Sequence, residues 1–184
     1  YFDDIYLSGE ISPPPGEAAG IYSESHTETM IPYQAIINSA DWGGNSAVPD
    51  LENSDVTPLD GNYVMAVDFQ AGGATYCGVS FDFGSVDISG YETLVFSIDN
   101  SVMTDLVHFG IKLEDSSAGN NEINISSLTP VLNGNWATYE IPLSQYPAVN
   151  LSDLKYLGLW NPRDNAENLL VGTLYFDDIH LISR

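Results

Sequence analysis

Val107-His108-Phe109-Gly110-Ile111-Lys112-Leu113 carries an apolar residue at every second position. Successive side chains of a β-strand point to opposite faces of the sheet, so the odd-numbered positions of this stretch face a core. His108 and Lys112 then point to the other side. The stretch therefore predicts a strand that is buried on one face only.

Strand patterns of this kind recur along the chain, bounded by Gly, Asn, Asp and Pro. We expect strands at 21–25, 33–38, 63–69, 76–83, 93–99, 107–114, 122–126, 137–141, 156–160 and 173–182. Helical spacing is confined to one turn near Ser152-Asp153-Leu154, and Asp50-Leu51-Glu52 and Glu114-Asp115 are interpreted as solvated loops. Many short strands without crossover helices indicate an all-β protein, an antiparallel β-sandwich of the jelly-roll type.

The same alternation assigns faces to the residues of 156–160. Leu157 and Leu159 belong to the core side, whereas Tyr156 and Trp160 belong to the opposite side. A large aromatic side chain on the outer side of a sheet calls for a partner. Trp160 is therefore the most informative single residue for function.

The composition describes a folded and strongly acidic domain. The chain has 184 residues, with Lys+Arg 4 against Asp+Glu 26 and a formal net charge of -22. Such a charge repels phosphate backbones and anionic lipid headgroups, so we expect neither a nucleic-acid nor a membrane partner. Hydrophobic residues make up 43% of the chain and charged residues 16%, which separates it from disordered acidic segments.

The cysteine count and the length of the apolar segments argue against a disulfide-rich or multi-cysteine zinc protein and against a membrane-spanning helix. Cys77 is the only cysteine, so the sequence holds no internal disulfide framework and no multi-cysteine zinc site. Its place within an apolar strand pattern predicts a small buried residue. No stretch approaches the roughly 20 apolar residues that span a bilayer as a helix.

A repeat links the two ends of the sequence. Tyr1-Phe2-Asp3-Asp4-Ile5-Tyr6-Leu7 recurs as Tyr175-Phe176-Asp177-Asp178-Ile179-His180-Leu181. An offset close to the chain length favours two similar modules in tandem. We interpret residues 1–10 as the closing strand of a preceding similar module, 11–20 as a Pro/Gly linker and 21–184 as the module itself. The alternative is that the first strand pairs within the same fold.

Several stretches together resemble one family, the galactose-binding-like β-jelly-roll carbohydrate-binding modules. The similar stretches are the closing repeat 175–181, Asn135-Trp136-Ala137-Thr138-Tyr139-Glu140-Ile141-Pro142-Leu143, Ile21-Tyr22-Ser23-Glu24 and Leu157-Gly158-Leu159-Trp160-Asn161. The resemblance covers essentially residues 21–182 and assigns Trp136 to packing. Such modules are typically appendages of secreted bacterial polysaccharide-degrading enzymes, often in tandem. The resemblance therefore implies a secreted chain whose parent also carries a similar module and a catalytic domain.

The resemblance also implies a structural calcium ion between the first and last strands. By position, Glu24 and Asp177 would supply carboxylates, and the loop at Asp41 would supply further oxygens. Calcium takes six to eight oxygen ligands, which suits carboxylates brought together. Strict alternation puts Asp177 on the core side with Ile179 and Leu181, so a metal or a dense set of hydrogen-bond donors must compensate its charge.

No catalytic arrangement stands out, and we expect a non-catalytic protein. Among 26 acidic residues some pair always looks suitable for glycoside hydrolysis, and no strand carries the Glu-x-Asp-x-x-Glu pattern of jelly-roll glucanases. A lyase needs a base beside a cation that neutralises a uronate, and the His, Lys and Arg residues show no such spacing. Gly78-Val79-Ser80 lacks the glycine that follows the serine of a nucleophile elbow.

Sugar recognition needs aromatic faces that stack on pyranose rings and fixed polar groups that bind hydroxyls. Trp160 ends an outward-facing strand next to further polar residues, and Trp42 lies in a Gly-rich loop, from which aromatics reach ligands easily. Lys112 and His108 stand on the outer side of their strand. The predicted ligand-binding set is Trp160, Arg163, Lys112, Trp42, Asn161 and His108.

Plainer interpretations of these residues stay open. Lys112 can form an ordinary ion pair with Glu114 or Glu122 within the sheet, without a role in ligand binding. Trp42 can fold over the calcium loop. The acidic charge favours a neutral or weakly charged polysaccharide such as a β-glucan, mannan or algal galactan. The alternative functions are a calcium-rigidified spacer or adhesion module of a cell-surface protein, and a jelly-roll glycoside hydrolase or lyase.

Overall fold

The computed structural model of the chain describes residues 18–26, 31, 34–36, 49–70, 77–99 and 101–183, and of 34–36 it describes the backbone. The expected closing strand 1–10 and the first part of the linker lie outside these residues. Residues 18–20 already belong to the first strand, so the expected linker overlaps it.

Twelve strands and three short 3-10 helices form within the described ranges, which contain no α-helix. The strands are β1 (Ala18–Tyr22), β2 (Gln34–Ile36), β3 (Asp50–Asn53), β4 (Val64–Phe69), β5 (Gly78–Val86), β6 (Thr93–Asp99), β7 (His108–Asp115), β8 (Asn120–Asn124), β9 (Val131–Asn133), β10 (Trp136–Pro142), β11 (Leu154–Arg163) and β12 (Gly172–Ile182). The 3-10 helices are η1 (Ile125–Ser127), η2 (Leu143–Gln145) and η3 (Leu151–Asp153). None of these helical segments is long and apolar enough to span a bilayer.

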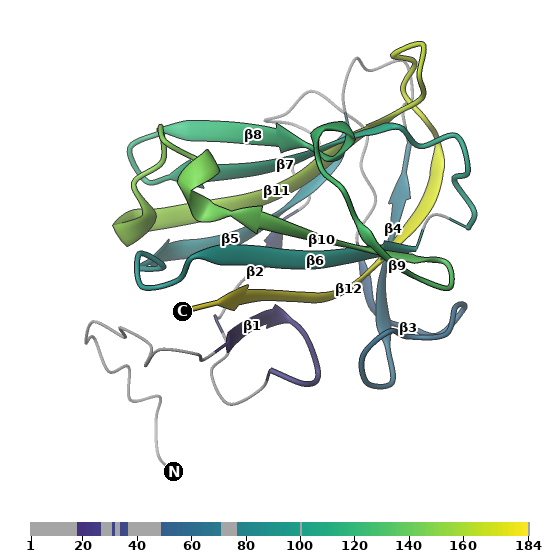
Figure 1. Ribbon diagram of the computed structural model, residues 1–184, viewed down its shortest axis with the longest axis horizontal. Helices are drawn as coiled ribbons and strands as arrows, with labels where there is room; N and C mark the ends of the chain where they lie inside the picture. Colours follow the sequence, from purple (N-terminus) through teal and green to yellow (C-terminus); the bar gives the residue numbers. More distant parts are fainter. Residues whose placement is uncertain are drawn as a thin grey trace.

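The strands form two antiparallel sheets packed face to face (Figure 1). Sheet A has the order β3-β4-β12-β6-β10-β9, with β1 also paired to β12, and sheet B has the order β2-β5-β11-β7-β8. The predicted all-β antiparallel β-sandwich is therefore confirmed. Because neighbouring strands come from distant parts of the sequence, the sheets bring the last strand against the first.

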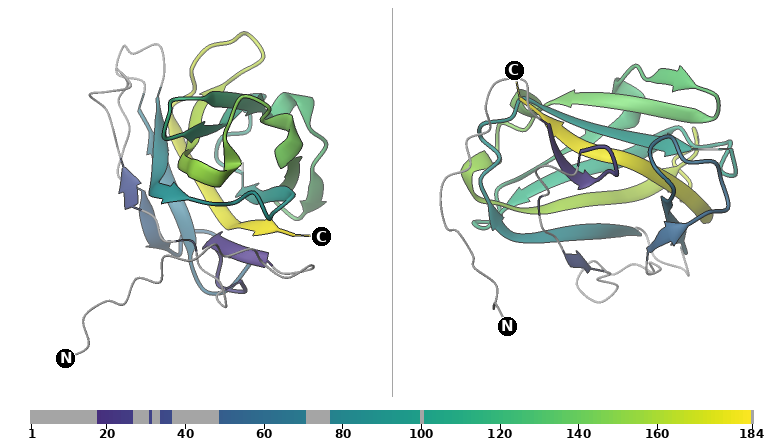
Figure 2. Two further views of the ribbon diagram at one scale, coloured as in Figure 1. Left: turned by 90° about the vertical axis from the view of Figure 1, so that its left-hand side faces the viewer. Right: turned by 90° about the horizontal axis from the view of Figure 1, so that it is seen from below.

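β12 joins three neighbours in sheet A. One edge pairs with β6, while the other pairs first with β4 and then with β1. Figure 2 shows β1, in purple, beside the C-terminal half of β12, in yellow. The predicted adjacency of the first and last strands of the module is thus present.

Every predicted strand overlaps an observed one, and the prediction 93–99 coincides with β6. Two strands were missed. Asp50-Leu51-Glu52 is not a loop, because it forms the edge strand β3, and β9 carries the exposed Val131 and Leu132 without an alternating pattern. Glu114-Asp115 is likewise the end of β7 and not a loop.

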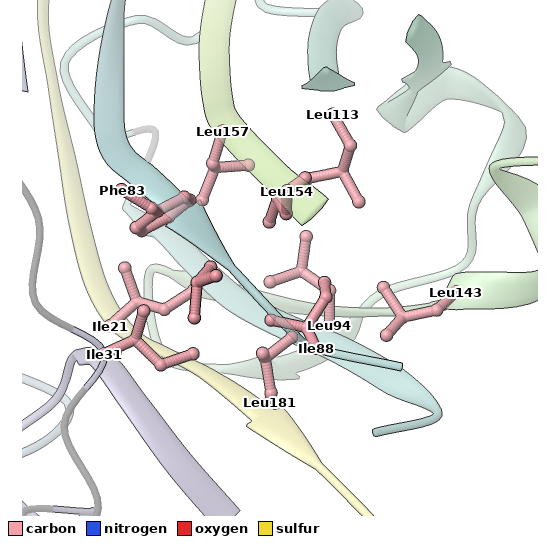
Figure 3. Close-up of a pocket in the computed structure, with 11 residues that line it drawn as sticks. Ile21, Ile31, Phe83, Ile88, Leu94, Leu113, Leu143, Leu154, Leu157 and Leu181 are labelled. Carbon is pink, nitrogen blue, oxygen red and sulfur yellow. The ribbon is translucent and has the colours of Figure 1, made fainter. Parts of the chain in front are cut away.

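The core lies between the sheets and follows the predicted alternation. Phe109, Ile111 and Leu113 of β7 are buried, as are Leu157 and Leu159 of β11. The side chains that they meet include inward residues of sheet A, and the apolar gap of about 10 Å³ that remains is lined only by carbon-rich side chains (Figure 3). A gap of this size is at the limit for one water and offers it no polar partner, so it is a packing defect and no ligand site.

Cys77 is buried within this core, as predicted, and is 1% exposed. Burial raises the pKa of its thiol to about 11, against the opposing charge of Arg163. The thiol is therefore protonated at neutral pH and inert as a nucleophile.

The alternation of β12 is broken by a bulge at Asp178. Asp178 has a φ of 50°, and the pairing with β6 shifts between Asp177 and His180. Asp177 pairs with Ser97 on the outer side of sheet A, whereas Ile179 lies in the core. The prediction that Asp177 shares a face with Ile179 is wrong, because one extra residue in a bulge reverses the faces that follow it.

Candidate functional site

The outer side of sheet B gathers most of the predicted ligand-binding residues. Its centre, here called the Trp160 face, is formed by the side chains of Tyr156, Trp160, Lys112, Glu114 and Glu122. Register fixes this grouping, because β11, β7 and β8 are neighbours and paired residues share a face. All five side chains are at least partly exposed.

Trp160 lies between two glycines. It pairs with Gly78 on β5 and with Gly110 on β7. A Cβ atom at Gly110 would lie 2.7 Å from both Cδ1 and Nε1 of the indole, and one at Gly78 would lie 2.3 Å from the Trp160 Cβ. Only residues without a side chain leave this space, so the ring rests directly on the backbone of β7.

Two charged side chains hold the indole in place. Its Nε1 donates a hydrogen bond of 2.7 Å to Oε2 of Glu122 on β8. Lys112 Nζ lies 5.3 Å from the ring centroid, within the range of a cation–π contact. The indole is therefore a fixed, half-buried platform.

Lys112 also pairs with a carboxylate on its own strand. Its Nζ lies 2.6 Å from Oε2 of Glu114. Of the two ion pairs that the sequence suggested for Lys112, the one with Glu114 is present. Glu122 instead accepts the hydrogen bond from the Trp160 indole. Both contacts leave Lys112 at the centre of the Trp160 face, two residues along β7 from Gly110.

Tyr156 supplies a second aromatic ring on the same face. It stands four residues from Trp160 on β11, or about 13 Å along an extended strand. Lys155 Nζ lies 4.8 Å from the Tyr156 ring, and the hydrogen bond with Tyr156 raises the pKa of Lys155. Gly158, between the two aromatic residues, leaves the floor flat.

Arg163 and His108 border the Trp160 face at the next row, where they are paired in register. Glu167, from the loop before β12, lies against both. Arg163 Nη1 donates to the Glu167 main-chain oxygen at 2.7 Å, and His108 Nε2 lies 3.2 Å from Oε1 of Glu167. The structure therefore brings Trp160, Lys112, Arg163 and His108 onto one side of sheet B.

Asn161 has a structural contact that the sequence did not reveal. Its φ is 56°, and it occupies the irregular end of β11 next to Trp160. Its Oδ1 accepts a hydrogen bond of 3.2 Å from the Cys77 main-chain N–H, and its own N–H donates to the Cys77 carbonyl at 2.8 Å. The side chain thus anchors the bend that follows Trp160.

Two predicted residues, Trp42 and Asp41, lie outside the described residues. Conversely, sequence reasoning missed Tyr156, Glu122 and the glycines beneath Trp160 as parts of the site. Alternation predicts that Tyr156 points outward on the same face as Trp160. This shared face was the feature of the sequence that could have identified Tyr156 as part of the site. Glu122 and Gly110 could not be found in this way, because their contacts depend on the register of β8 and β7.

Positive charge is concentrated beside the Trp160 face. The chain has Lys+Arg 4, and Lys112, Lys155 and Arg163 lie on β7 and β11. The carboxylates of Asp82, Glu114 and Glu122 lie on the same side of the sheet. Cationic and carboxylate groups therefore alternate around two aromatic rings, a combination that suits a polar ligand with apolar faces.

The outer side of sheet A is arranged differently. Residues 54–63, here called the cover loop, pack over it, and Val56 and Leu59 contact a small apolar cluster that contains Trp136. Trp136 is 6% exposed, and its Nε1 donates to the Thr57 carbonyl at 3.0 Å. The predicted packing role of Trp136 is consistent with this burial.

A polar hollow of about 500 Å³ lies between the cover loop and the turn from β9 to β10. Asp55, Asp99, Asn133 and Asn135 contribute to its lining. Trp136 also borders it, but the ring is buried and its N–H is used by the cover loop. The hollow lacks a platform for stacking, so the Trp160 face is the stronger candidate for a sugar.

Asp177 is buried under the cover loop and compensated by backbone donors. Its Oδ2 accepts from the N–H groups of Leu59 and Asp60 at 2.8 and 3.0 Å, and its Oδ1 accepts from that of Asp178 at 2.7 Å. Burial raises the pKa of Asp177 to about 6, although these three donors oppose the shift. Of the two means of compensation considered above, the donors are present.

Glu24 and Asp60 fasten the cover loop to the segment after β1. Glu24 accepts from the N–H groups of Asn62 and Tyr63. Asp60 Oδ2 accepts from the N–H groups of Glu24 and Ser25 at 2.8 and 2.7 Å. The bond from the Asn62 N–H, first of all, lowers the pKa of Glu24. Burial raises the pKa of Asp60, but the Ser25 hydroxyl and N–H, with the other donors, outweigh it and lower this pKa.

Four carboxylates, Glu24, Asp60, Asp177 and Asp178, thus meet where β1, β12 and the cover loop join, a region called here the acidic corner. Their charge suits a hard cation such as calcium. Every buried side-chain nitrogen and oxygen of the described residues already has a hydrogen-bond partner, so the fold does not require a metal to satisfy them. A calcium ion would add to the hydrogen bonds of Asp177 rather than replace them.

The sequence matches no protein-family model and no curated protein. PfGH50B superposes with a TM-score of 0.54 at 18% identity, over 84% of this chain and 23% of its own. The family 11 carbohydrate-binding module from Clostridium thermocellum, solved in complex with a β-1,3-1,4-mixed-linked tetrasaccharide, gives 0.51 at 15% identity over 93% of this chain and 98% of its own. The β-1,2-glucanase from Parabacteroides distasonis gives 0.51 at 17% identity over 90% of this chain and 22% of its own.

The chain therefore spans less than a quarter of PfGH50B and of the glucanase, and nearly the whole of the binding module. At these identities the likeness concerns the fold. It confirms, at that level, the resemblance to jelly-roll carbohydrate-binding modules that the sequence predicted.

Proposed function

We propose that the chain is a non-catalytic carbohydrate-binding module that attaches a polysaccharide-degrading enzyme to its glycan. The observation that carries the proposal is the fixed indole of Trp160, which rests on Gly110 at the centre of the outer side of sheet B. An indole in this position can stack on the apolar face of a pyranose ring. The shared fold with a module solved in complex with a glucan tetrasaccharide supports the proposal.

The polar groups of the Trp160 face would form hydrogen bonds with the hydroxyl groups of the sugar. Lys112 donates hydrogen bonds, and Glu114 and Glu122 accept them, so both kinds of contact are available beside the ring. Tyr156 provides a second stacking position further along β11, which favours a chain over a single sugar. Because carboxylates flank both rings, the ligand is a neutral or weakly charged polysaccharide such as a β-glucan, mannan or algal galactan.

Affinity electrophoresis through gels that each contain one polysaccharide tests the proposal. We expect retardation by one glycan, and isothermal titration with oligosaccharides of that glycan should give an affinity that Trp160→Ala lowers at least about tenfold. Tyr63→Ala is the matched control, because Tyr63 is another exposed aromatic residue, 44% exposed, away from sheet B. This variant should bind as the original chain does.

The alternatives predict different results in the same assays. A spacer or adhesion module migrates unchanged through every glycan, and that result would overturn the proposal. A hydrolase releases reducing sugar, and a lyase forms an unsaturated product with ultraviolet absorbance. We expect neither product after prolonged incubation with the retarding glycan.

The proposal extends to the setting of the module and to calcium. The secreted parent chain and its catalytic domain follow the family resemblance, and the similar tandem module is supported by the repeat of residues 1–7 at 175–181. Structural calcium at the acidic corner would be held by Glu24 and Asp177, with Asp41 outside the described residues. Calcium should then raise the melting temperature and EGTA should lower it. An unchanged melting temperature would remove calcium from the proposal without affecting the sugar site.

A further inference from the structure

Two histidines and one aspartate meet on the outer side of sheet A, at the edge of the acidic corner, with which they share Asp178. They are His26, from the segment after β1, and Asp178 and His180 of β12. One ligand atom from each lies within 4.8 Å of the other two, and no other group of three His, Cys, Asp or Glu ligand atoms converges in this way in the described part of the chain. Asp178 Oδ1 lies 3.0 Å from His180 Nδ1 and 3.9 Å from His26 Nε2.

The bulge of β12 creates this arrangement. Asp178 adopts a φ of 50°, in the left-handed region that glycine, asparagine and aspartate adopt more readily than other residues. The bulge sets its side chain over His180, which is only 6% exposed. His26 then lies against His180, with ring centroids 4.1 Å apart.

We propose that His26, Asp178 and His180 form a binding site for a borderline divalent transition metal such as Zn²⁺. Two imidazoles and one carboxylate are a donor set that zinc accepts, with a water in the remaining position. The site is chemically distinct from the calcium position proposed above, since calcium takes oxygen ligands. The inference does not depend on sugar binding.

The site needs only a small adjustment to close on a metal. Tetrahedral zinc with bonds of about 2.0–2.1 Å keeps its ligand atoms about 3.4 Å apart. The two separations from Asp178 Oδ1, 3.0 and 3.9 Å, bracket this value, and all three ligand atoms lie within 4.8 Å of one another. His26 has a side-chain exposure of 32% and can rotate, whereas the buried His180 is fixed.

The metal-free contacts explain how the site stays formed. His180 Nδ1 lies 3.0 Å from both the Asp178 carboxylate and the Asp178 main-chain oxygen, and Ser23 Oγ donates to Asp178 Oδ1 at 2.9 Å. These contacts orient the ligands before a metal arrives. The contacts of Nδ1 require it to carry a hydrogen, whereas metal binding requires its lone pair. Metal binding therefore moves the hydrogen of His180 to Nε2 and replaces these two contacts with the bond to the metal.

A metal at this site would clip the segment after β1 to β12. His26 lies beyond the end of β1, and the other two ligands lie in the bulge of the last strand. The cover loop meets the same segment through Asp60. Zinc would therefore stabilise the junction at which the first and last strands of the module meet.

Isothermal titration with ZnCl₂ in the presence of excess CaCl₂ tests the inference on the whole chain. We expect saturation at one zinc per chain and a melting temperature that rises with zinc. His26→Gln and Asp178→Asn should each weaken binding at least about tenfold. Asparagine tolerates a positive φ, so Asp178→Asn removes the charge and keeps the bulge.

His108→Gln is the matched control, because it removes the remaining histidine of the chain, on sheet B, and should bind zinc unchanged. Co²⁺ gives a second readout, since its visible absorption reports coordination by nitrogen and oxygen. The inference is overturned by the absence of saturable binding, by ligand variants that bind as the original chain does, or by an equal loss in His108→Gln. Glycan retardation should be the same with and without zinc, so a failure here is separate from a failure of the proposed function.

Discussion

The outer sides of the two sheets each carry a tryptophan, and the molecule treats them in opposite ways. Trp136 on sheet A is 6% exposed beneath the cover loop, and its indole N–H donates to a main-chain carbonyl of that loop. Trp160 on sheet B is half-buried, and its N–H donates to the Glu122 side chain. The described residues include no segment packed over Trp160 in the way that Val56 and Leu59 pack over Trp136.

The difference shows what distinguishes a packing tryptophan from a candidate binding one. Both rings need a surface on one side. For Trp136 a loop supplies the other side, and the acidic corner fastens that loop through Asp60 and Asp177. For Trp160 the glycine floor supplies one side, and under the proposed function a ligand would stack on the ring from outside the sheet. Stability should therefore depend on Trp136 and glycan affinity on Trp160.

The largest expected effect is the loss of stability in Trp136→Ala. Removing a buried indole should lower the free energy of unfolding by about 3–5 kcal/mol. Urea unfolding followed by circular dichroism measures this. Glycan affinity, measured at a temperature where the variant is folded, should stay within about twofold. A stable variant that no longer binds would instead locate the ligand on sheet A.

Gly110→Ala should act on the other face and with the opposite selectivity. The new Cβ would lie 2.7 Å from the indole Nε1 and 2.6 Å from Oε1 of Glu122, so the ring must tilt away from β7. We expect glycan affinity to fall about tenfold, while the free energy of unfolding changes by less than about 1 kcal/mol because the side chains that move lie on the outer side of the sheet and not in the core. An unchanged affinity together with altered tryptophan fluorescence would show that the indole is no platform.

A carboxylate at the end of β7, that of Asp115, stabilises the framework of sheet B. Asp115 is buried, and it accepts from the N–H groups of Ser117 and Gly119 at 2.9 Å and of Asn150 at 2.8 Å. The bond from Asn150, followed by the other two, lowers the pKa of Asp115 against the effect of burial. Because the folded pKa is the lower one, the unfolded chain takes up the proton first on acidification.

The stabilisation from Asp115 is therefore complete above about pH 4 and is lost as pH falls through the folded pKa. Asp115→Asn should melt about 2–6 °C below the original chain at pH 7, and the difference should shrink below pH 4. Melting curves between pH 7 and pH 3 measure this. A difference that stays constant with pH would mean that the charge is not the cause. Glycan affinity at pH 7 should not change, since Asp115 lies outside the Trp160 face.

Sequence alternation correctly predicts which face of a strand a side chain occupies. It does not predict features that depend on the register between strands. Alternation alone turned Trp160 and Lys112 outward and Phe109 inward, and all three lie as predicted. It failed at Asp177, because the bulge at Asp178 has no glycine to announce its positive φ. The edge strand β3 was missed because its alternation is weak and it pairs along only one edge.

The candidate site follows the same rule. The residues that the sequence grouped from one strand were found, but the contact of Glu122 with Trp160 joins β8 to β11 across β7. Such a contact depends on two successive pairings, neither of which is written in local periodicity. The bend at Asn161 is a second case, since its hydrogen bond reaches Cys77, 84 residues away.

The smallest expected effect tests how much the charge of Glu122 contributes to the platform. Glu122→Gln keeps an oxygen that can accept from the Trp160 N–H, but the bond is no longer charge-assisted and is about half as strong. The indole should then be held less firmly, and glycan affinity should fall about two- to threefold, as measured by titration calorimetry. Glu140→Gln is the matched control, because Glu140 is exposed on β10 of sheet A and should leave the affinity unchanged. If the two variants behave alike, the glycine floor and Lys112 suffice to fix the ring, and the contrast between the two tryptophans then depends on the cover loop alone.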